Sequence, residues 1–111
     1  MSLIKESTLF APFEIWEVPL DGGMIKFHEP LIVKPKILLP EEPGDPTYWT
    51  VDVPDLDLSA VGISFEELQS CVRSDICMTW KNCVRKNDAS LTPKNRNVKQ
   101  RYLSIAEEVG G

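Results

Sequence analysis

Three aspartates, Asp52, Asp55 and Asp57, cluster in the segment VDVPDLD. Clustered carboxylates can bind a divalent cation and support phosphodiester chemistry. Aspartate is also favoured in turns, because its side chain hydrogen-bonds the neighbouring backbone. We interpret the cluster as turn chemistry, since the sequence shows no further ligands for a pair of catalytic metal ions. A hydrolase acting through these three residues is the alternative.

His28 is the only histidine in the chain. The sequence has no Gly-rich phosphate loop, no pair of histidines at metal-binding spacing and no nucleophile elbow. Metal or nucleophilic catalysis would have to assemble around His28 without a motif, so we interpret it as a surface or hydrogen-bonded side chain. We therefore predict that the protein is not an enzyme and holds no cofactor or metal.

The three cysteines, Cys71, Cys77 and Cys83, are spaced six residues apart. On one helix each step turns about 240°, which places the sulfurs on three different sides, so they cannot converge on one metal. An odd number of cysteines in a chain without an export signal indicates reduced thiols. We interpret them as small apolar fillers or incidental surface thiols.

Asp75 projects beside the apolar face of the helix in which we expect it, with no cation three or four residues away. A carboxylate in that position needs a partner. We expect a lysine of the sheet or a basic residue of the second helix to pair with it. The alternative is a functional acid with a perturbed pKa.

Residues 73–101 contain eight basic and two acidic side chains, an excess that can meet phosphates. On the second helix Lys94 and Arg101 project to one flank, whereas Arg96 and Lys99 lie towards the other flank and the back, so no single basic stripe results. We interpret this charge as solvated or paired with the acidic N-terminal half. Nucleic-acid binding is the alternative.

Charge is divided unevenly over the 111 residues. Residues 1–67 carry 4 basic and 13 acidic side chains, giving −9, while residues 68–111 carry 8 and 4, giving +4. Such asymmetry indicates attraction within the fold, self-association or an anionic partner for the basic part. No apolar run is long enough to span a membrane and the N-terminus does not resemble a secretory signal, so we expect a soluble cytoplasmic protein.

The first sixty residues predict short strands. Residues 13–19, FEIWEVP, and the following MIKFHEP flank the turn signal Asp21-Gly22-Gly23 and predict a β-hairpin. Residues 31–38 place Lys34 and Lys36 opposite the apolar positions, and Pro35 indicates an edge or bulged strand. Residues 48–53, YWTVDV, predict a strand with Trp49 and Val51 on one face, and residues 56–61 return antiparallel to it.

The remainder predicts two helices. Ser64 followed by Glu67 is a capping box, and the helix should run to residues 85–88 with its apolar face formed by Phe65, Leu68, Val72, Ile76 and Cys83. Thr92 and Pro93 begin a second helix over 92–109, with Val98, Tyr102, Ile105, Ala106 and Val109 on one side. Leu103 falls outside that stripe and is either an ordinary exposed leucine or a dimer contact.

These elements predict one α+β domain over 1–111: an antiparallel sheet of four or five strands with two C-terminal helices packed on one face. Residues 1–12 are expected to form a flexible N-terminal segment. The order, with strands first and helices last, argues against alternating β/α units.

The run from Tyr48 to about Arg85, YWTVDVPDLDLSAVGISFEELQSCVRSDICMTWKNCVR, resembles the HicB-like antitoxin domains. In that family an aromatic strand leads into a Pro-Asp/Glu-Leu turn, here Pro54-Asp55-Leu56, and a second strand leads through a glycine, here Gly62, to a capped helix. The resemblance implies a HicB-like core over 31–87 with a partial ribonuclease-H-like fold and no working nuclease site. It also implies a small RNA-cleaving toxin as the protein that the domain binds and occludes.

We therefore predict a solitary HicB-like domain without a DNA-binding segment, which binds or regulates a protein partner through its sheet edge and first helix. We expect a homodimer. The candidate partner-binding residues are Lys34, Lys36, Asp75, Lys94, Arg96, Lys99 and Arg101.

Overall fold

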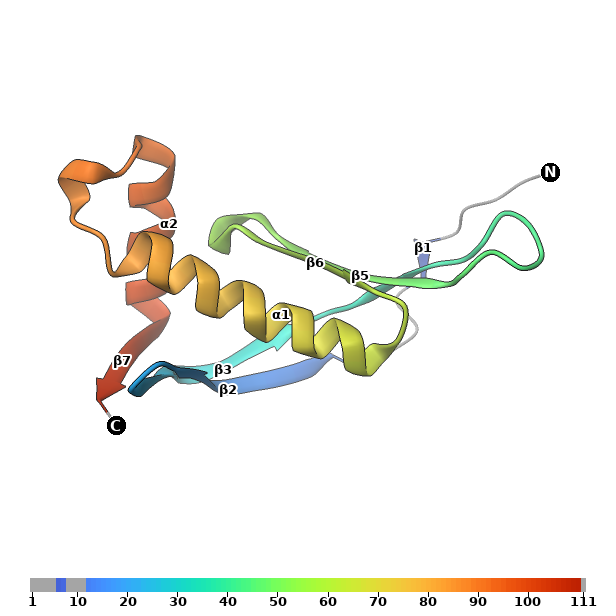
Figure 1. Cartoon of the computed structure of the whole chain (residues 1–111), viewed down its shortest axis with the longest axis horizontal. Helices are drawn as coiled ribbons and strands as arrows, with labels where there is room; N and C mark the ends of the chain where they lie inside the picture. Colours follow the sequence, from blue (N-terminus) through green and yellow to red (C-terminus); the bar gives the residue numbers. More distant parts are fainter. Residues whose placement is uncertain (1–5, 8–11, 111) are drawn as a thin grey trace.

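A computed structural model describes residues 6–7 and 12–110 of the chain. Seven strands and two α-helices follow in the order shown in Figure 1. The predicted flexible segment over 1–12 falls almost wholly outside the described residues. The strands form two antiparallel sheets, a four-stranded sheet of order β1-β4-β5-β6 and a three-stranded sheet of order β2-β3-β7.

The predicted hairpin is present. Strands β2 (Phe13–Leu20) and β3 (Gly23–Val33) pair antiparallel around Asp21 and Gly22. Gly22 has a φ of 74°, a conformation that glycine adopts without steric cost. In this pairing the buried residues Ile15, Val18 and Leu20 point to the same side of the sheet as Ile25 and Phe27 of the partner strand.

The predicted strand over 31–38 is broken at Lys34-Pro35. Val33 ends β3, and β4 (Lys36–Leu38) begins in the other sheet, so this short bend carries the chain between the two sheets. Proline lacks the N–H that a continuing ladder requires, which explains why pairing stops here.

Strands β5 (Tyr48–Val53) and β6 (Leu58–Gly62) form the antiparallel pair expected from the sequence. A 3₁₀ turn, Pro54–Leu56, joins them, and Asp57 closes it in the left-handed conformation with a φ of 50°. The two-residue strand β1 (Glu6–Ser7) completes this sheet beside β4.

Gly62 and Ser64 position the first helix, α1 (Phe65–Thr79). The Ser64 hydroxyl accepts the Glu67 N–H at 3.1 Å, and the Glu67 carboxylate accepts the Ile63 N–H at 3.4 Å. This is the predicted capping arrangement, which satisfies otherwise unpaired amides at the helix start. A Cβ on Gly62 would lie 2.8 Å from the Leu68 nitrogen, so only glycine lets the end of β6 approach the helix this closely.

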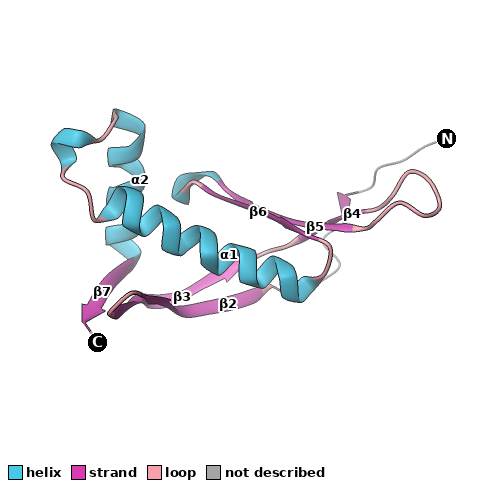
Figure 2. Ribbon diagram, viewed as in Figure 1, coloured by secondary structure: helices cyan, strands magenta, loops and turns pink. Residues whose placement is uncertain are grey.

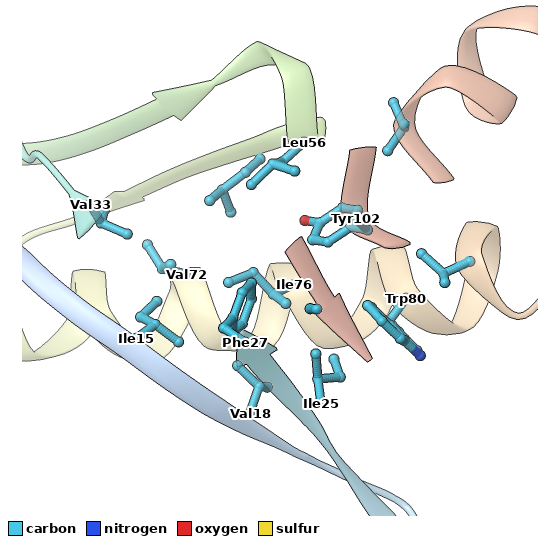
Figure 3. Close-up of a cluster of buried hydrophobic side chains, with 14 of the residues drawn as sticks. Ile15, Val18, Ile25, Phe27, Val33, Leu56, Val72, Ile76, Trp80 and Tyr102 are labelled. Atoms are coloured by element: carbon cyan, nitrogen blue, oxygen red, sulfur yellow. The ribbon is translucent and has the colours of Figure 1, made fainter. Parts of the chain in front are cut away.

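Helix α1 lies between the two sheets, contacting β5 and β6 on one side and β2 on the other (Figure 1). On its predicted apolar face Leu68, Val72 and Ile76 are buried and Phe65 is half-buried. Trp80 and Cys83 continue this face through a π-helical turn, Trp80–Val84, in which the Arg85 N–H donates to the Trp80 carbonyl at 2.9 Å. The Phe65 ring lies 5.3 Å from the Trp49 ring. Figure 3 shows residues of β2, β3, both helices and the turn between β5 and β6 meeting in this core, to which Val51 and Leu58 of the other sheet also belong.

Helix α2 (Pro93–Ile105) begins as predicted, with the Thr92 hydroxyl accepting the Asn95 N–H at 3.2 Å after a short 3₁₀ turn, Asp88–Ser90. The prediction that this helix continues to 109 is wrong. Residues Ala106–Gly110 form strand β7, which pairs with Gly23–Phe27 of β3. Backbone hydrogen bonds to an otherwise open strand edge thus replace the last helical turn.

The α+β class is confirmed, and the strands divide between two sheets where the sequence predicted one. The bend at Pro35 separates β3 from β4, and β7 pairs with the β2-β3 hairpin to make the second sheet. Helix α1 consequently packs between sheets, while α2 lies at one end of the molecule (Figure 2). Among the described residues, no helix has the length and apolar character needed to cross a membrane.

Candidate partner-binding surface

The face of the β2-β3-β7 sheet that points away from the core carries exposed apolar side chains. Trp16 follows buried Ile15 on β2, and Ile32 precedes buried Val33 on β3, so the alternation of a strand directs both outwards. Trp16 is 56% exposed and Ile32 is 46% exposed. Tryptophan is largely buried on average in folded proteins and is enriched at interfaces, so its exposure makes Trp16 a candidate contact residue.

An irregularity in the sheet positions Trp16. Between the pairs Ile15↔Leu31 and Glu17↔Lys26, β2 contributes Trp16 alone, whereas β3 contributes Phe27 to Pro30. Bulges of this kind redirect side chains and commonly lie at functional sites. Pro30 within the bulge agrees with the exclusion of proline from regular ladder positions.

We define the outer face as the outward residues of this sheet. Its charged residues pair across the strands: Lys26 lies opposite Glu17 and Glu107, and the His28 imidazole lies 3.6 Å from the Glu107 carboxylate. Three glutamates and one lysine leave the outer face acidic. Its members are Glu14, Trp16, Glu17, Pro19, Met24, Lys26, His28, Ile32, Glu107 and Val109.

Sequence reasoning did not single out Trp16, although a signal was present. In FEIWEVP the alternation fails at Ile15-Trp16, where two large apolar residues follow one another. One of them had to face solvent, and the failed alternation also indicated the bulge. The full extent of the outer face depends on the pairing of β7 with β3, which adds Glu107 and Val109 to it.

Asp75 has a partner of a different kind from the cation expected. Its carboxylate accepts the main-chain N–H of Ser59 at 3.1 Å. Ser59 lies on β6, the edge strand of its sheet, so Asp75 occupies a hydrogen-bonding position that faces away from β5. The predicted salt bridge is therefore wrong, and α1 uses this side chain to protect a strand edge.

The four basic residues predicted on α2 differ in whether they form ion pairs. The Lys99 ammonium lies 2.7 Å from the Asp88 carboxylate and 2.7 Å from the Lys86 carbonyl, so it stabilises the loop before α2. Lys94, Arg96 and Arg101 are exposed, and within the described residues no carboxylate pairs with them.

The seven predicted partner-binding residues do not form one site. Lys34 lies in the bend before β4 and Lys36 lies on β4, whereas the basic residues of α2 lie at the other end of the molecule (Figure 2). The interpretation that charge pairs with the acidic N-terminal half is supported at one position, where the Lys81 ammonium lies 2.8 Å from the Asp21 carboxylate. Lys81 correspondingly lowers the pKa of the Asp21 carboxyl.

The three aspartates of the cluster are divided between a strand and the turn that follows it. Asp55 belongs to the 3₁₀ turn and Asp57 closes it, and both are exposed, as is Asp52 on β5. Among the described residues no group of three or more His, Cys, Asp or Glu side chains is arranged to hold a metal ion. His28 is exposed beside Glu107, as expected of a surface histidine.

The described cysteines are free. Cys83 is buried, its thiol donates to the Asn95 carbonyl at 3.0 Å, and burial raises the pKa of that thiol. A raised pKa keeps the thiol protonated and therefore unreactive. Cys83 thus connects the π-helical turn to α2 as a small buried side chain.

A cleft of about 390 Å³ adjoins the outer face. It opens at the edge of β3 beyond Ala106, the first residue of β7, and Phe27, Leu31, Leu56 and Ile105 supply its apolar walls. His28 and Ile32 belong both to this cleft and to the outer face, so an occupant of one can extend into the other. Arg101 is the only predicted partner-binding residue among those that line it.

Comparison with known proteins identifies no relative: no family model, no curated protein and no solved structure matches this chain.

Proposed function

We propose that this chain is a non-enzymatic protein-binding domain of HicB-like, antitoxin-like type, which binds its partner through the outer face of the β2-β3-β7 sheet. The exposure of Trp16 carries the proposal. Tryptophan is enriched among the residues that dominate binding energy at protein interfaces, and a second exposed apolar residue, Ile32, lies on the same face of the adjacent strand. Acidic side chains around these two residues resemble the polar rim of an interface.

Charge favours a basic partner. The outer face has three glutamates against one lysine, and the neutral form of His28 adds no charge. Electrostatic complementarity speeds association and excludes partners of the same sign. A small RNA-cleaving toxin, the partner class implied by the family resemblance, must itself present cationic groups because its substrate is a polyanion.

The HicB-like assignment rests on the resemblance and on one packing arrangement that accompanies it. The helix introduced by Ser64 packs against the side of β5 that bears Trp49 and Val51, with the Phe65 and Trp49 rings 5.3 Å apart. A strand, turn, strand and capped helix in this order support a HicB-like core over 31–87 as part of the proposal.

Affinity purification of the tagged full chain from its source cells tests the proposed function. Changing Trp16 and Ile32 together to serine should remove the bound protein partner, and Trp16→Ala alone should weaken the purified complex by roughly 30-fold, the effect of a strong interface residue. Because both side chains are exposed, the midpoint of thermal unfolding should not change.

The matched control changes Val61 and Ile63 to serine. These residues are 53% and 62% exposed on β6 and just before α1, the edge and helix that the sequence had suggested for partner binding. Loss of the partner in this control, with retention in the Trp16 and Ile32 variant, would contradict the outer face as the binding surface. Recovery of nucleic acid without protein would contradict the proposed function itself.

A further inference from the structure

Leu103 projects from a basic face of α2. It is 44% exposed, and Arg96 lies seven residues earlier, two helical turns away on the same face. Lys99 lies between them, although its ammonium is already held by Asp88. Gln100 is the remaining exposed neighbour, so this face presents one apolar side chain within a cationic and polar surround.

The loop between β4 and β5 forms a hollow of complementary character. Its volume is about 370 Å³, and two of its apolar members, Leu39 and Tyr48, are each 41% exposed. Glu41 and Asp45 supply its charge, and none of the described residues that line it is a cation. The described residues that line it are Leu38, Leu39, Pro40, Glu41, Asp45, Pro46 and Tyr48.

A turn gives this loop a defined shape. The Asp45 N–H donates to the Glu42 carbonyl at 3.2 Å, and Gly44 between them has a φ of 95°, which favours glycine. Prolines on either side restrict the backbone further. A hollow that is formed in advance binds with less loss of conformational entropy.

The hollow and Leu103 cannot meet within one chain. The molecule measures 50 × 29 × 21 Å, and Figure 1 shows α2 at one end and the loop between β4 and β5 at the other. Two copies arranged antiparallel, side by side, would bring each hollow opposite the α2 of the other copy. A two-fold axis then forms both contacts at once and leaves neither open.

We propose that this protein forms an antiparallel homodimer in which Leu103 of each copy enters the hollow formed by residues 38–48 of the other, with Arg96 facing Glu41 and Asp45. This interface is separate from the outer face and does not depend on the proposed function. Among the described residues Arg96, Glu41 and Asp45 have no ion-pair partner, so dimerisation breaks no existing pair. Opposite charges on the two surfaces steer the copies into this register.

Sedimentation velocity of the full chain tests the dimer. The wild type should be dimeric, and its dissociation constant should rise with ionic strength. Arg96→Glu, Glu41→Arg and Leu103→Ser should each raise that constant by roughly tenfold or more, because they replace attraction with repulsion or remove the apolar contact. Circular dichroism should show that these exposed substitutions leave the fold intact.

Mixing provides the decisive measurement. Arg96→Glu chains repel one another at the hollow, and so do Glu41→Arg chains, but an equimolar mixture restores opposite charges at both contacts of the pair. The mixture should therefore dimerise while each variant alone stays monomeric. Lys94→Glu is the matched control, because Lys94 is nine residues from Leu103, half a turn away on the helix, and its reversal should leave the dimer unchanged.

Three results would overturn the proposal: a wild-type monomer at millimolar concentration, equal weakening by Lys94→Glu and Arg96→Glu, or a mixture that stays monomeric. Assemblies larger than two copies would overturn the closed antiparallel arrangement, because an open head-to-tail contact grows without limit.

Discussion

At the scale of single residues, Glu108 accepts more side-chain hydrogen bonds than any other described residue. Its carboxylate accepts the Trp80 indole N–H at 2.8 Å and two Arg85 guanidinium N–H groups at 3.0 and 2.9 Å. Arg85 and then Trp80 lower the pKa of the Glu108 carboxyl. This single glutamate of β7 therefore links the C-terminal strand to the residues at the end of α1.

We expect Glu108→Ala to lower the free energy of unfolding by about 1–2 kcal/mol, measured by urea denaturation at neutral pH. Most of the loss comes from the Trp80 N–H, because Trp80 is 1% exposed and would lose its acceptor, whereas a part-exposed ion pair contributes little. Glu107→Ala on the outward side of β7 is the control and should change stability far less.

The same site predicts a pH dependence. Because folding lowers the pKa of Glu108, its charge stabilises the native state above the ordinary glutamate pKa, and this contribution is lost as the pH falls through the lowered value. The stability difference between wild type and Glu108→Gln should therefore be largest at neutral pH and shrink below about pH 4. A difference that grows on acidification would contradict this linkage.

Tyr102 predicts a stabilising substitution. Its side chain is buried and packs edge-on against Trp80, with ring centroids 5.9 Å apart, yet no described group hydrogen-bonds its hydroxyl. Burial raises the pKa of the phenol, which stays neutral. We expect Tyr102→Phe to raise the free energy of unfolding by about 1 kcal/mol, because a buried polar group without a partner is removed. A loss of stability in the same urea experiment would indicate a hydrogen bond to the hydroxyl.

At the scale of secondary-structure elements, α1 stabilises the edges of both sheets. It covers β6 on one side and β2 on the other, and Asp75 pairs with the exposed edge of β6 through the Ser59 N–H. An uncovered strand edge invites pairing with other chains. The helix thus supplies both the core face and a barrier to aggregation.

Asp75→Ala should lower the free energy of unfolding by about 1 kcal/mol and increase light scattering on prolonged incubation, since the Ser59 N–H becomes available to another strand. Asp75→Asn retains an acceptor oxygen and should behave like the wild type. If both variants aggregate equally, the negative charge rather than the hydrogen bond protects the edge.

Gly62→Ala tests the approach of β6 to α1. The added methyl group would lie 2.8 Å from the Leu68 backbone nitrogen, so the strand or the helix must shift. We expect a loss of about 1–3 kcal/mol in the free energy of unfolding, as for other overpacked sites. Gly110→Ala, where no atom lies within 4 Å of the added methyl group, should change stability by much less.

At the scale of the whole molecule, two sheets and two helices share one core. Apart from Ile37, the buried hydrophobic residues of the described chain form one cluster that includes Ile15 and Phe27 of one sheet, Val51 of the other, Ile76 of α1 and Tyr102 of α2. A shared core couples the stability of all elements. Cooperative unfolding of all these elements would agree with the single domain predicted from the chain length.

Urea unfolding should therefore give coincident transitions by far-ultraviolet circular dichroism and by the fluorescence of Trp80, studied in a variant that has Trp16 and Trp49 replaced by phenylalanine. Circular dichroism reports all elements, whereas Trp80 reports the junction of α1, α2 and β7. Separate midpoints would contradict a single cooperative domain.

The sequence by itself determined the local elements. Neighbouring residues specify the backbone conformation at the capping box of Ser64, the N-cap of Thr92, the turn at Gly22 and the alternation in YWTVDV. Each element begins where these signals place it. The apolar face of α1 was equally predictable, since helical spacing alone selects it.

Only the tertiary structure decided how these elements are shared between two sheets. Residues 106–110 have no strong local preference, and the open edge of β3 made them a strand by supplying backbone hydrogen bonds that a last helical turn would otherwise provide. The partner of Asp75 and the exposure of Trp16 were also decided by tertiary packing, because whether a side chain is covered depends on elements distant in sequence. Local propensity therefore determined the elements. Pairing between strands distant in sequence determined the outer face of the β2-β3-β7 sheet, on which the proposed function rests.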